Sequence, residues 1–327
     1  MVIADSVTGT RDAGSVVVGD RVAEVSPIDP LQPLTAGRYC DGVVSVVGGD
    51  TDVSPVDARI VRTAHFELWR SGRRLVVRHR MTPDVIDDAL TTMINDELFG
   101  PGWVSGSEMF ERIFTGIVLT SASSPIEAWL LFYRNSLRRY DAVSDASGAE
   151  SAVAGPRDAL ADFASIHRHA DELVPADATV LELGCCFGFL SLRLARAAGR
   201  SVIASDLSAG TVGLLQVVAG RLGLPLQTLV ADAARIPRPD RSVDVVLLVH
   251  LLEHLEADHC RRAIDEALRV ASRRVIIAVP YEDEPTPAYG HLWTLDDSDL
   301  RAWGSATTGW NWSVHEYFGG WLVFDRI

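Results

Sequence analysis

The stretch Val180-Leu-Glu-Leu-Gly-Cys-Cys-Phe-Gly-Phe-Leu190 decides the fold of this chain. Its first half consists of β-branched and leucine residues around Glu182, which predicts a buried strand. The glycines predict a tight turn, and the apolar residues after Gly188 predict the start of a helix. A strand that passes through a glycine turn into a helix is typical of ligand-binding α/β sheets, because the amide groups at the helix start face the ligand.

The alternation of strand and helix continues from this stretch to the end of the chain. Repeated units of this kind favour a parallel sheet with helices on both faces. We therefore assign residues 156–327 to one α/β domain. Short apolar runs predict strands at 179–183, 201–205, 226–230, 243–249 and 274–279, and helices are predicted at 156–173, 190–198, 209–222 and 258–271.

A different pattern precedes this domain. Residues 59–80 alternate polar and apolar side chains on both sides of Ser71-Gly72, which predicts a β-hairpin. Helices are predicted from Pro83 to about residue 98 and from Pro125 to about residue 140, each with a hydroxyl residue before the proline as a cap. Residues 38–140 thus form a predicted small α+β domain, for which we expect a role in substrate capping or in forming a homodimer.

Two segments have little to bury. Residues 1–37 lack a sustained period and are expected to form a flexible N-terminal tail. Residues 141–155 are mainly Ala, Ser, Gly and acidic residues, which is typical of a linker.

Composition excludes several classes of protein. The 327 residues carry a net charge of −14, and all 30 basic residues are arginine, so a basic groove for nucleic acid is not expected. The sequence has neither a long uninterrupted apolar run nor a signal-type N-terminus, so no membrane association is expected. Its 4 cysteines form no CxxC pair, which favours a cytoplasmic protein with reduced thiols.

Acidic residues follow the predicted strands at the edge where such sheets bind ligands. Gly184 and Gly188 would let the backbone approach a ligand where a Cβ would clash. Asp206 ends the second strand, where a carboxylate can accept both hydroxyls of a ribose, and Asp232 ends the third strand, within reach of an adenine edge.

Two alternative interpretations of this layout are weaker. A dinucleotide site would need glycine at positions 186 and 189, where the chain has Cys186 and Phe189, so a pyrophosphate could not come close. A nucleotide fold that has lost its ligand would make the glycines mere turn residues and Asp206 a helix cap. The agreement of several features in order and spacing argues against that loss.

The motif resembles the first motif of the class I S-adenosylmethionine-dependent methyltransferases, E/D-x-G-x-G-x-G. Glu182, Gly184 and Gly188 match it, and Cys186 replaces the middle glycine. The resemblance implies S-adenosyl-L-methionine as the cofactor and a Rossmann-like sheet, parallel with an antiparallel last strand. The cofactor-binding residues that it implies are Glu182, Gly184, Gly188, Asp206, Leu207, Asp232, Ala233 and His250.

The fourth strand runs into His250-Leu-Leu-Glu253-His254. As H-x-x-E-H this segment matches an inverted zinc-protease motif, but that motif needs a long helix and here follows a strand. Some quinone O-methyltransferases of the class carry E-x-x-E-H at this point. We expect His254 to be the catalytic base and Glu253 to orient it. The three residues would share a helical face if a divalent ion bound, and the sequence leaves the metal undecided.

Acidic and aromatic residues follow the fifth strand at the same sheet edge. Aromatic faces beside carboxylates suit a polyhydroxylated acceptor such as a sugar. Trp310 and Trp321 are expected only to pack the last hairpin. The predicted substrate-binding residues are Tyr281, Glu282, His291 and Trp293.

Taken whole, the chain resembles the mycofactocin oligosaccharide methyltransferases of actinobacteria. The resemblance rests on residues 59–99, 110–117, 129–139 and 315–326. It implies O-methylation of a glucose in the glucan chain of mycofactocin. Two alternatives stay open, namely an O-methyltransferase for a quinone or another phenol, and a non-catalytic partner protein that retains cofactor binding.

Overall fold

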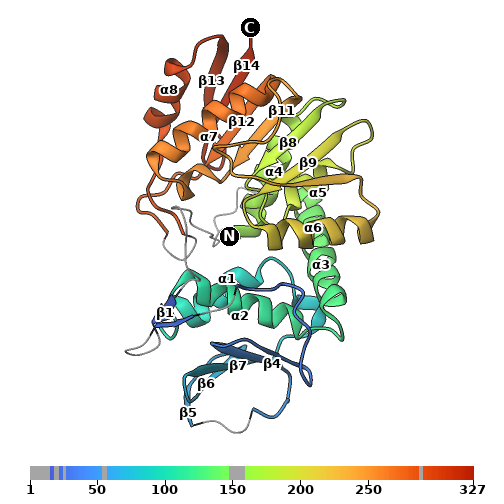
Figure 1. Ribbon diagram of the computed structural model, residues 1–327, viewed down its shortest axis with the longest axis vertical. Coiled ribbons are helices and arrows are strands. Elements are labelled where there is room, and N and C mark those ends of the chain that lie inside the picture. The colour runs from blue at the N-terminus through green and yellow to red at the C-terminus, as the bar shows by residue number, and fades with distance from the viewer. Residues whose placement is uncertain (1–14, 18–21, 25–26, 54–56, 147–158, 287–289) are drawn as a thin grey trace. The chain divides into compact units, whose positions relative to one another are not determined.

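The computed structural model describes residues 15–17, 22–24, 27–53, 57–146, 159–286 and 290–327 (Figure 1). The chain divides into two compact units, with the division between Tyr140 and Asp141. Each unit has its own sheet and its own buried core.

The unit that begins at Asp141 contains a seven-stranded sheet of order β10-β9-β8-β11-β12-β14-β13. Strands β8 to β12 pair in parallel, and β14 is antiparallel to both of its neighbours, which confirms the Rossmann-like sheet with an antiparallel last strand. The strands are β8 (Thr179–Leu183), β9 (Ser201–Asp206), β10 (Leu226–Val230), β11 (Val243–Val249), β12 (Ala271–Val279), β13 (Trp310–Glu316) and β14 (Gly320–Arg326).

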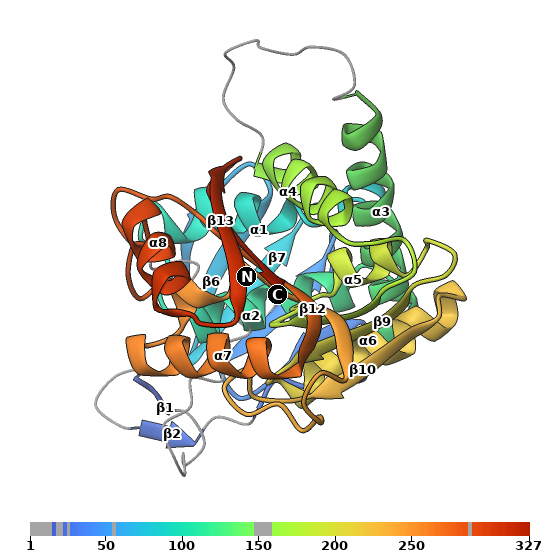
Figure 2. The ribbon, with the colours of Figure 1, turned by 90° about the horizontal axis from the view of Figure 1, so that it is seen from above.

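Helices cover both faces of this sheet, as Figure 2 shows for α4 and α5 on one side and α7 on the other. One core cluster joins Ile166 and Leu190 to Trp321, and the opposite one joins Ile264 and Leu300 to Phe324. The helices are α4 (Ala159–Leu173), α5 (Phe189–Leu194), α6 (Ala209–Leu222), α7 (Ala257–Val270) and α8 (Asp297–Ala306).

Two further predictions for this unit can be compared with the structure. Trp310 and Trp321 are buried, which confirms that they pack the last hairpin. Helix α5 ends at Leu194, earlier than predicted. The backbone N–H of Arg196 donates to the Arg193 carbonyl oxygen at 3.1 Å, three residues back, which is the tighter hydrogen-bond pattern of a 3₁₀ turn.

The other unit contains a five-stranded sheet of order β3-β4-β7-β6-β5. The predicted hairpin is confirmed as β6 and β7, which pair antiparallel around a turn at Gly72 and Arg73. The strands and α-helices of this part of the chain are β1 (Ser15–Val17), β2 (Val22–Glu24), β3 (Arg38–Cys40), β4 (Val44–Gly48), β5 (Ala58–Arg62), β6 (Phe66–Ser71), β7 (Arg74–His79), α1 (Leu90–Ile94), α2 (Ser107–Leu119) and α3 (Pro125–Ala146).

The helix predicted from Pro83 is broken into three pieces. A 3₁₀ turn (Pro83–Val85) is followed by α1 and by a π-helical turn (Asn95–Phe99). The break has a long-range cause, since the Asn135 amide donates to the carbonyl oxygens of Pro83 (2.9 Å) and Ile86 (3.0 Å). These oxygens are therefore satisfied without a continuous helix.

The predicted tail and linker differ from the structure where it describes them. Residues 27–37 are ordered, and the Trp129 indole donates to the Pro30 carbonyl oxygen at 2.5 Å. Order therefore begins before Tyr39, and β1 pairs with β2. Helix α3 continues to Ala146, so the first residues of the expected linker are helical. The remainder of the linker and of the tail lies outside the described residues.

The buried histidine of strand β7 predicts a loss of stability in acid. His79 is 1% exposed, its Nε2 lies 2.9 Å from the Thr120 hydroxyl oxygen, and burial lowers its pKa to about 4. Between that value and the ordinary pKa of about 6.5, the unfolded chain binds more protons than the folded chain. The free energy of unfolding should therefore fall by about 3 kcal/mol as the pH drops through this window.

Urea denaturation of the wild type and of His79→Gln at several pH values measures this contribution. The variant should lose less stability in acid than the wild type. Identical pH profiles for the wild type and His79→Gln would contradict the prediction.

Candidate functional site

The loop after strand β8 has the backbone conformation that its glycines suggested. Gly184 (φ 67°), Cys186 (φ 49°) and Gly188 (φ 69°) all lie in the left-handed region. Cys186 thus adopts the conformation that the middle glycine of the motif would adopt, at a steric cost of about 1–2 kcal/mol. The loop keeps its form despite the substitution.

The structure gives a packing reason for the two glycines, and the approach of a ligand to the backbone stays a prediction. A Cβ on Gly184 would lie 2.6 Å from Cδ1 of Leu251, and one on Gly188 would lie 2.4 Å from Cδ2 of Leu215. The contacts that exclude a side chain are therefore with apolar protein groups. They hold the loop against the segment after β11 and against helix α6.

Asp206, the last residue of β9, faces this loop. Its Oδ2 accepts the Cys186 N–H at 3.0 Å, and its Oδ1 accepts the Ser208 N–H at 2.9 Å. The carboxylate is 8% exposed, whereas the next side chain, Leu207, is 39% exposed. A fixed carboxylate beside an exposed apolar group suits the ribose and the adenine face of an adenosyl compound.

Glu182 lies buried beneath the loop. The Ser191 hydroxyl of helix α5 donates to its Oε2, and burial raises the pKa of the carboxyl group to about 7. The contact ties the strand end to the helix start. Direct contact of Glu182 with a cofactor stays a prediction.

Asp232 follows strand β10 and has a partner that sequence reasoning missed. Its Oδ1 accepts the Ala234 N–H at 2.8 Å and lies 2.7 Å from Nε2 of His259 in helix α7. The neighbouring Ala233 is partly buried. No local signal marks His259, because the contact joins two elements that are distant in sequence.

The segment from His250 to His254 does not form one helix. His250 has a φ of +52°, and a 3₁₀ turn, η3 (Leu252–His254), follows it. The expectation that His250, Glu253 and His254 share a helical face is therefore wrong. The same geometry rules out the helix of the inverted zinc-protease motif. Burial lowers the pKa of His250 to about 3, and its ring centroid lies 5.4 Å from that of Phe163.

A different third residue joins Glu253 and His254. One ligand atom of each of Glu253, His254 and His291 lies within 4.8 Å of the others, and we call these residues the Glu-His-His cluster. Burial raises the pKa of Glu253 to about 8 and lowers that of His254 to about 3. Among the described residues Glu253 makes no hydrogen bond to His254, whose Nδ1 instead lies 3.3 Å from the Gly290 carbonyl oxygen.

The segment after β12 supplies the rest of this site. Glu282 contacts Nδ1 of His291 at 2.6 Å and accepts the Thr286 hydroxyl at 2.8 Å. Two other predicted substrate residues pack on the protein. The Trp293 indole donates to the Leu255 carbonyl oxygen at 2.9 Å, and the Tyr281 ring fills the space beside Gly320.

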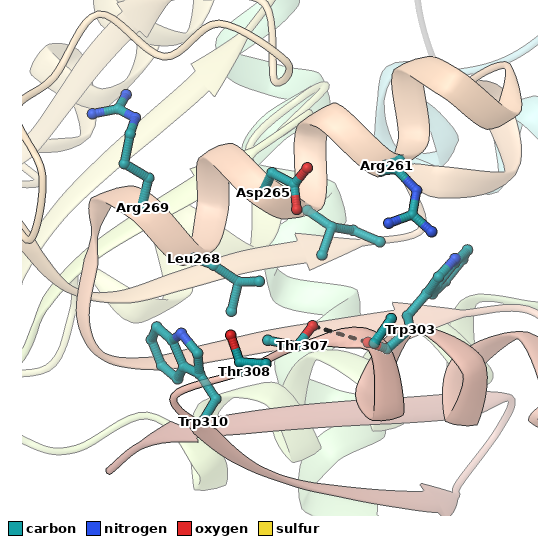
Figure 3. Close-up of a pocket in the computed structure, with 10 residues that line it drawn as sticks. Arg261, Asp265, Leu268, Arg269, Trp303, Thr307, Thr308 and Trp310 are labelled. Atoms are coloured by element: carbon teal, nitrogen blue, oxygen red, sulfur yellow. Dashed lines mark hydrogen bonds between the residues drawn. The ribbon is translucent and has the colours of Figure 1, made fainter.

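A cavity of about 340 Å³ lies elsewhere in the unit, between helix α7 and the α8–β13 segment (Figure 3). The Thr307 hydroxyl donates to the Trp303 carbonyl oxygen at its wall. None of the predicted site residues lines this cavity. Its lining residues are Arg261, Ile264, Asp265, Leu268, Arg269, Trp303, Ala306, Thr307, Thr308 and Trp310.

A comparison with known protein families identifies the part of the chain that contains this loop and these strand ends. The profile of a family described as "Methyltransferase domain" matches residues 180–273, from β8 into β12. These residues form a methyltransferase domain. Its cofactor is S-adenosyl-L-methionine. Within the described part of the chain, no helix is both long and apolar enough to cross a membrane.

Individual relatives of the methyltransferase domain are distant. Ajmaline N-methyltransferase of Rauvolfia serpentina is 28% identical over 186 residues, which are 53% of this chain and 61% of that enzyme. The PH0226 protein of Pyrococcus horikoshii OT3 has a TM-score of 0.44 at 14% identity, covering 53% of this chain and 93% of that protein. Magnesium protoporphyrin IX methyltransferase from Synechocystis PCC 6803 has a TM-score of 0.40 at 20% identity, and the match covers 58% of this chain and 90% of that enzyme.

The residues of the methyltransferase domain fit the adenosyl cofactor. Asp206 is held at the loop by two backbone amides, Leu207 offers an apolar face, and Cys186 keeps the left-handed turn. These features meet at the carboxyl ends of parallel strands, where open α/β sheets bind ligands.

Proposed function

We propose that the chain is an S-adenosylmethionine-dependent O-methyltransferase that methylates a glucose hydroxyl of the mycofactocin oligosaccharide. The observation that carries the reaction type is that Asp206 ends β9 while Glu253 and His254 of the Glu-His-His cluster follow β11, with only β8 between these two strands. β9 and β11 both pair with β8, and Leu251 touches the loop at Gly184. The donor site and a group of proton acceptors therefore share one edge of the sheet.

The residues at this edge would have different roles in methyl transfer. When bound, the cofactor supplies a methyl carbon on a sulfonium, whose C–S bond breaks as the new O–C bond forms. Asp206 would hold the ribose, and Asp232 the adenine edge. Burial lowers the pKa of His254 to about 3, so the ring is neutral at pH 7 and would take the proton of the acceptor hydroxyl as a weak base while the C–S bond breaks.

The choice of acceptor rests on the family resemblance and on the chemistry beside the cluster. Glu282 and His291 offer charged and polar groups to a hydroxylated ligand, and Trp293 lies nearby on the same segment. This combination supports a sugar acceptor. A phenol would bind through ring contacts and would not need this polar set.

A second candidate is N-methylation of an amine. It is favoured by the name of the relative, ajmaline N-methyltransferase, which matches 53% of this chain. A neutral amine is already a nucleophile, so that reaction would depend less on a base than O-methylation does.

The two candidates are tested with isotopically labelled S-adenosyl-L-methionine and purified protein. Separate reactions receive an extract of oligoglucosides, a catechol or quinol, and an alkaloid amine. Mass spectrometry of the products should find the labelled methyl on a glucose oxygen in the first reaction. Labelling of the amine or the phenol alone would replace the proposed acceptor, whereas donor binding without any product would favour the non-catalytic alternative.

Replacing His254 tests the role of the cluster in turnover. His254→Ala should lower kcat by about 10²–10⁴-fold, the range expected for a lost base, and should leave donor affinity almost unchanged. Steady-state kinetics and calorimetry with the donor measure the two effects. Unchanged turnover would remove His254 from the mechanism, and a parallel loss of donor binding would indicate a structural effect.

A further inference from the structure

We propose that Glu253, His254 and His291 bind a divalent transition-metal ion of the zinc class. Metal binding itself does not depend on the proposed function, but the ion's part in turnover rests on it. The proposal differs from the arrangement that the sequence suggested, because His291 comes from another segment and His250 is not a ligand.

The first argument is the geometry of the cluster. Two imidazoles and one carboxylate each have one ligand atom within 4.8 Å of the ligand atoms of the other two. Nitrogen and oxygen ligands around a tetrahedral zinc ion lie about 3.3 Å apart, given bonds of about 2.0–2.1 Å. The two rings meet edge to face, with centroids 4.8 Å apart, so rotations of the side chains bring the three ligand atoms to that spacing.

The second argument is independent of the first. The side chain of Glu253 is 1% exposed, and neither carboxylate oxygen has a hydrogen-bond partner among the described residues. A buried carboxyl group without partners is unfavourable in either protonation state, since the acid form would still leave an O–H donor unsatisfied. Nδ1 of His250 lies 3.9 Å from Oε1 of Glu253, which is too far for a hydrogen bond. A bound cation would compensate the charge of the Glu253 carboxylate.

Outer contacts of the two histidines are those of metal ligands. A metal-bound histidine usually donates its second ring nitrogen to a carboxylate or a carbonyl oxygen. Nδ1 of His291 has such a contact with Glu282 (2.6 Å), and Nδ1 of His254 has one with the Gly290 carbonyl oxygen (3.3 Å). The ion would then be bound through Nε2 of each ring.

Backbone contacts hold the two segments together without an ion. The Leu292 N–H donates to the carbonyl oxygen of Glu253 at 2.9 Å, and the Trp293 indole donates to Leu255. His291 is thereby fixed beside the η3 turn. The ligand set is thus largely preformed, which lowers the ordering cost of metal binding.

The ligand types select the class of ion. Imidazole nitrogens suit Zn²⁺, Fe²⁺, Co²⁺ and Ni²⁺, whereas Mg²⁺ and Ca²⁺ prefer oxygen ligands. Three protein ligands leave a coordination position open, as catalytic zinc sites do. An ion there would lower the pKa of a bound acceptor hydroxyl, so that its proton would pass to water, and His254 would then serve as a metal ligand in place of acting as the base.

The test measures metal uptake by the full chain in the absence of donor and acceptor. Protein freed of metal with a chelator is titrated with ZnCl₂ by calorimetry, and CoCl₂ provides an absorption spectrum that reports the coordination geometry. The wild type should bind about one equivalent. Glu253→Gln and His291→Ala should each weaken binding by more than about 100-fold, and Glu282→Gln, outside the first coordination shell, by about 10–100-fold.

His65→Ala is the matched control, because His65 pairs with Glu97 but has no third metal-ligating residue beside it in the part of the chain that the structure describes. It should bind zinc as the wild type does. Thermal unfolding of each variant checks that the fold is retained, and Glu253→Gln keeps the size of the side chain. The proposal is overturned if the wild type takes up no zinc, or if Glu253→Gln and His291→Ala bind it with wild-type affinity. Neither result depends on which acceptor is methylated.

Discussion

Asp206→Ala should abolish measurable binding of S-adenosyl-L-methionine. In the proposed donor site this carboxylate would accept two ribose hydroxyls, and hydrogen bonds to a charged group contribute about 1.5–3 kcal/mol each. Loss of both corresponds to a decrease in affinity of more than about 100-fold. Isothermal titration calorimetry with the donor measures this directly.

Two further variants separate this effect from a change in the loop. Asp206 also accepts the amides of Cys186 and Ser208, so Asp206→Asn, which keeps one acceptor oxygen, should disturb the loop less and still bind the donor weakly. The exposed Asp177 provides a carboxylate control, and Asp177→Ala should bind the donor normally. Wild-type affinity in Asp206→Ala would refute the donor site as placed here.

Gly188→Ala should destabilise the protein strongly. The residue has a φ of +69°, and an added Cβ would lie 2.4 Å from Cδ2 of Leu215. The left-handed conformation costs an alanine about 1–2 kcal/mol, and overpacking costs about 1–3 kcal/mol more. The free energy of unfolding in urea should therefore fall by about 2–5 kcal/mol.

Another glycine of the same unit gives the opposite expectation. Gly213 lies inside helix α6 with nothing within 4 Å of an added Cβ, so Gly213→Ala should stabilise the protein by about 0.5–1 kcal/mol. In a Leu215→Ala background the cost of Gly188→Ala should shrink to the backbone strain alone. Equal stability of Gly188→Ala and the wild type would show that the loop is less constrained than its contacts indicate.

The α/β domain was predictable because its signals are local. Strands β8, β10 and β11 have the predicted bounds, since each is a short apolar run between turn residues. The edge that carries Asp206 and Asp232 follows from the rule that parallel strands bind ligands at their carboxyl ends. The fold and the position of Asp206 and Asp232 at one edge of the sheet therefore follow from spacing and residue type.

The acceptor side was less predictable because long-range contacts shape it. The left-handed turn at His250 and the η3 turn remove the helical face expected for His250 to His254. His291 reaches Glu253 through a hydrogen bond from Leu292, which spacing does not reveal. Asn135 has the same kind of effect in the other unit, where it satisfies carbonyl groups and interrupts a helix with good local signals.

The position of β14 has a consequence for biosynthesis. Residues 320–326 are made after every other strand of the sheet, yet β14 lies between β12 and β13. Until this segment leaves the ribosome, the edge of β12 has no antiparallel neighbour, and an open strand edge invites association with other chains. The sheet can therefore be completed only after its last strand is synthesised. A nascent chain stalled before residue 320 would expose the unpaired edge of β12, to which chaperones could bind.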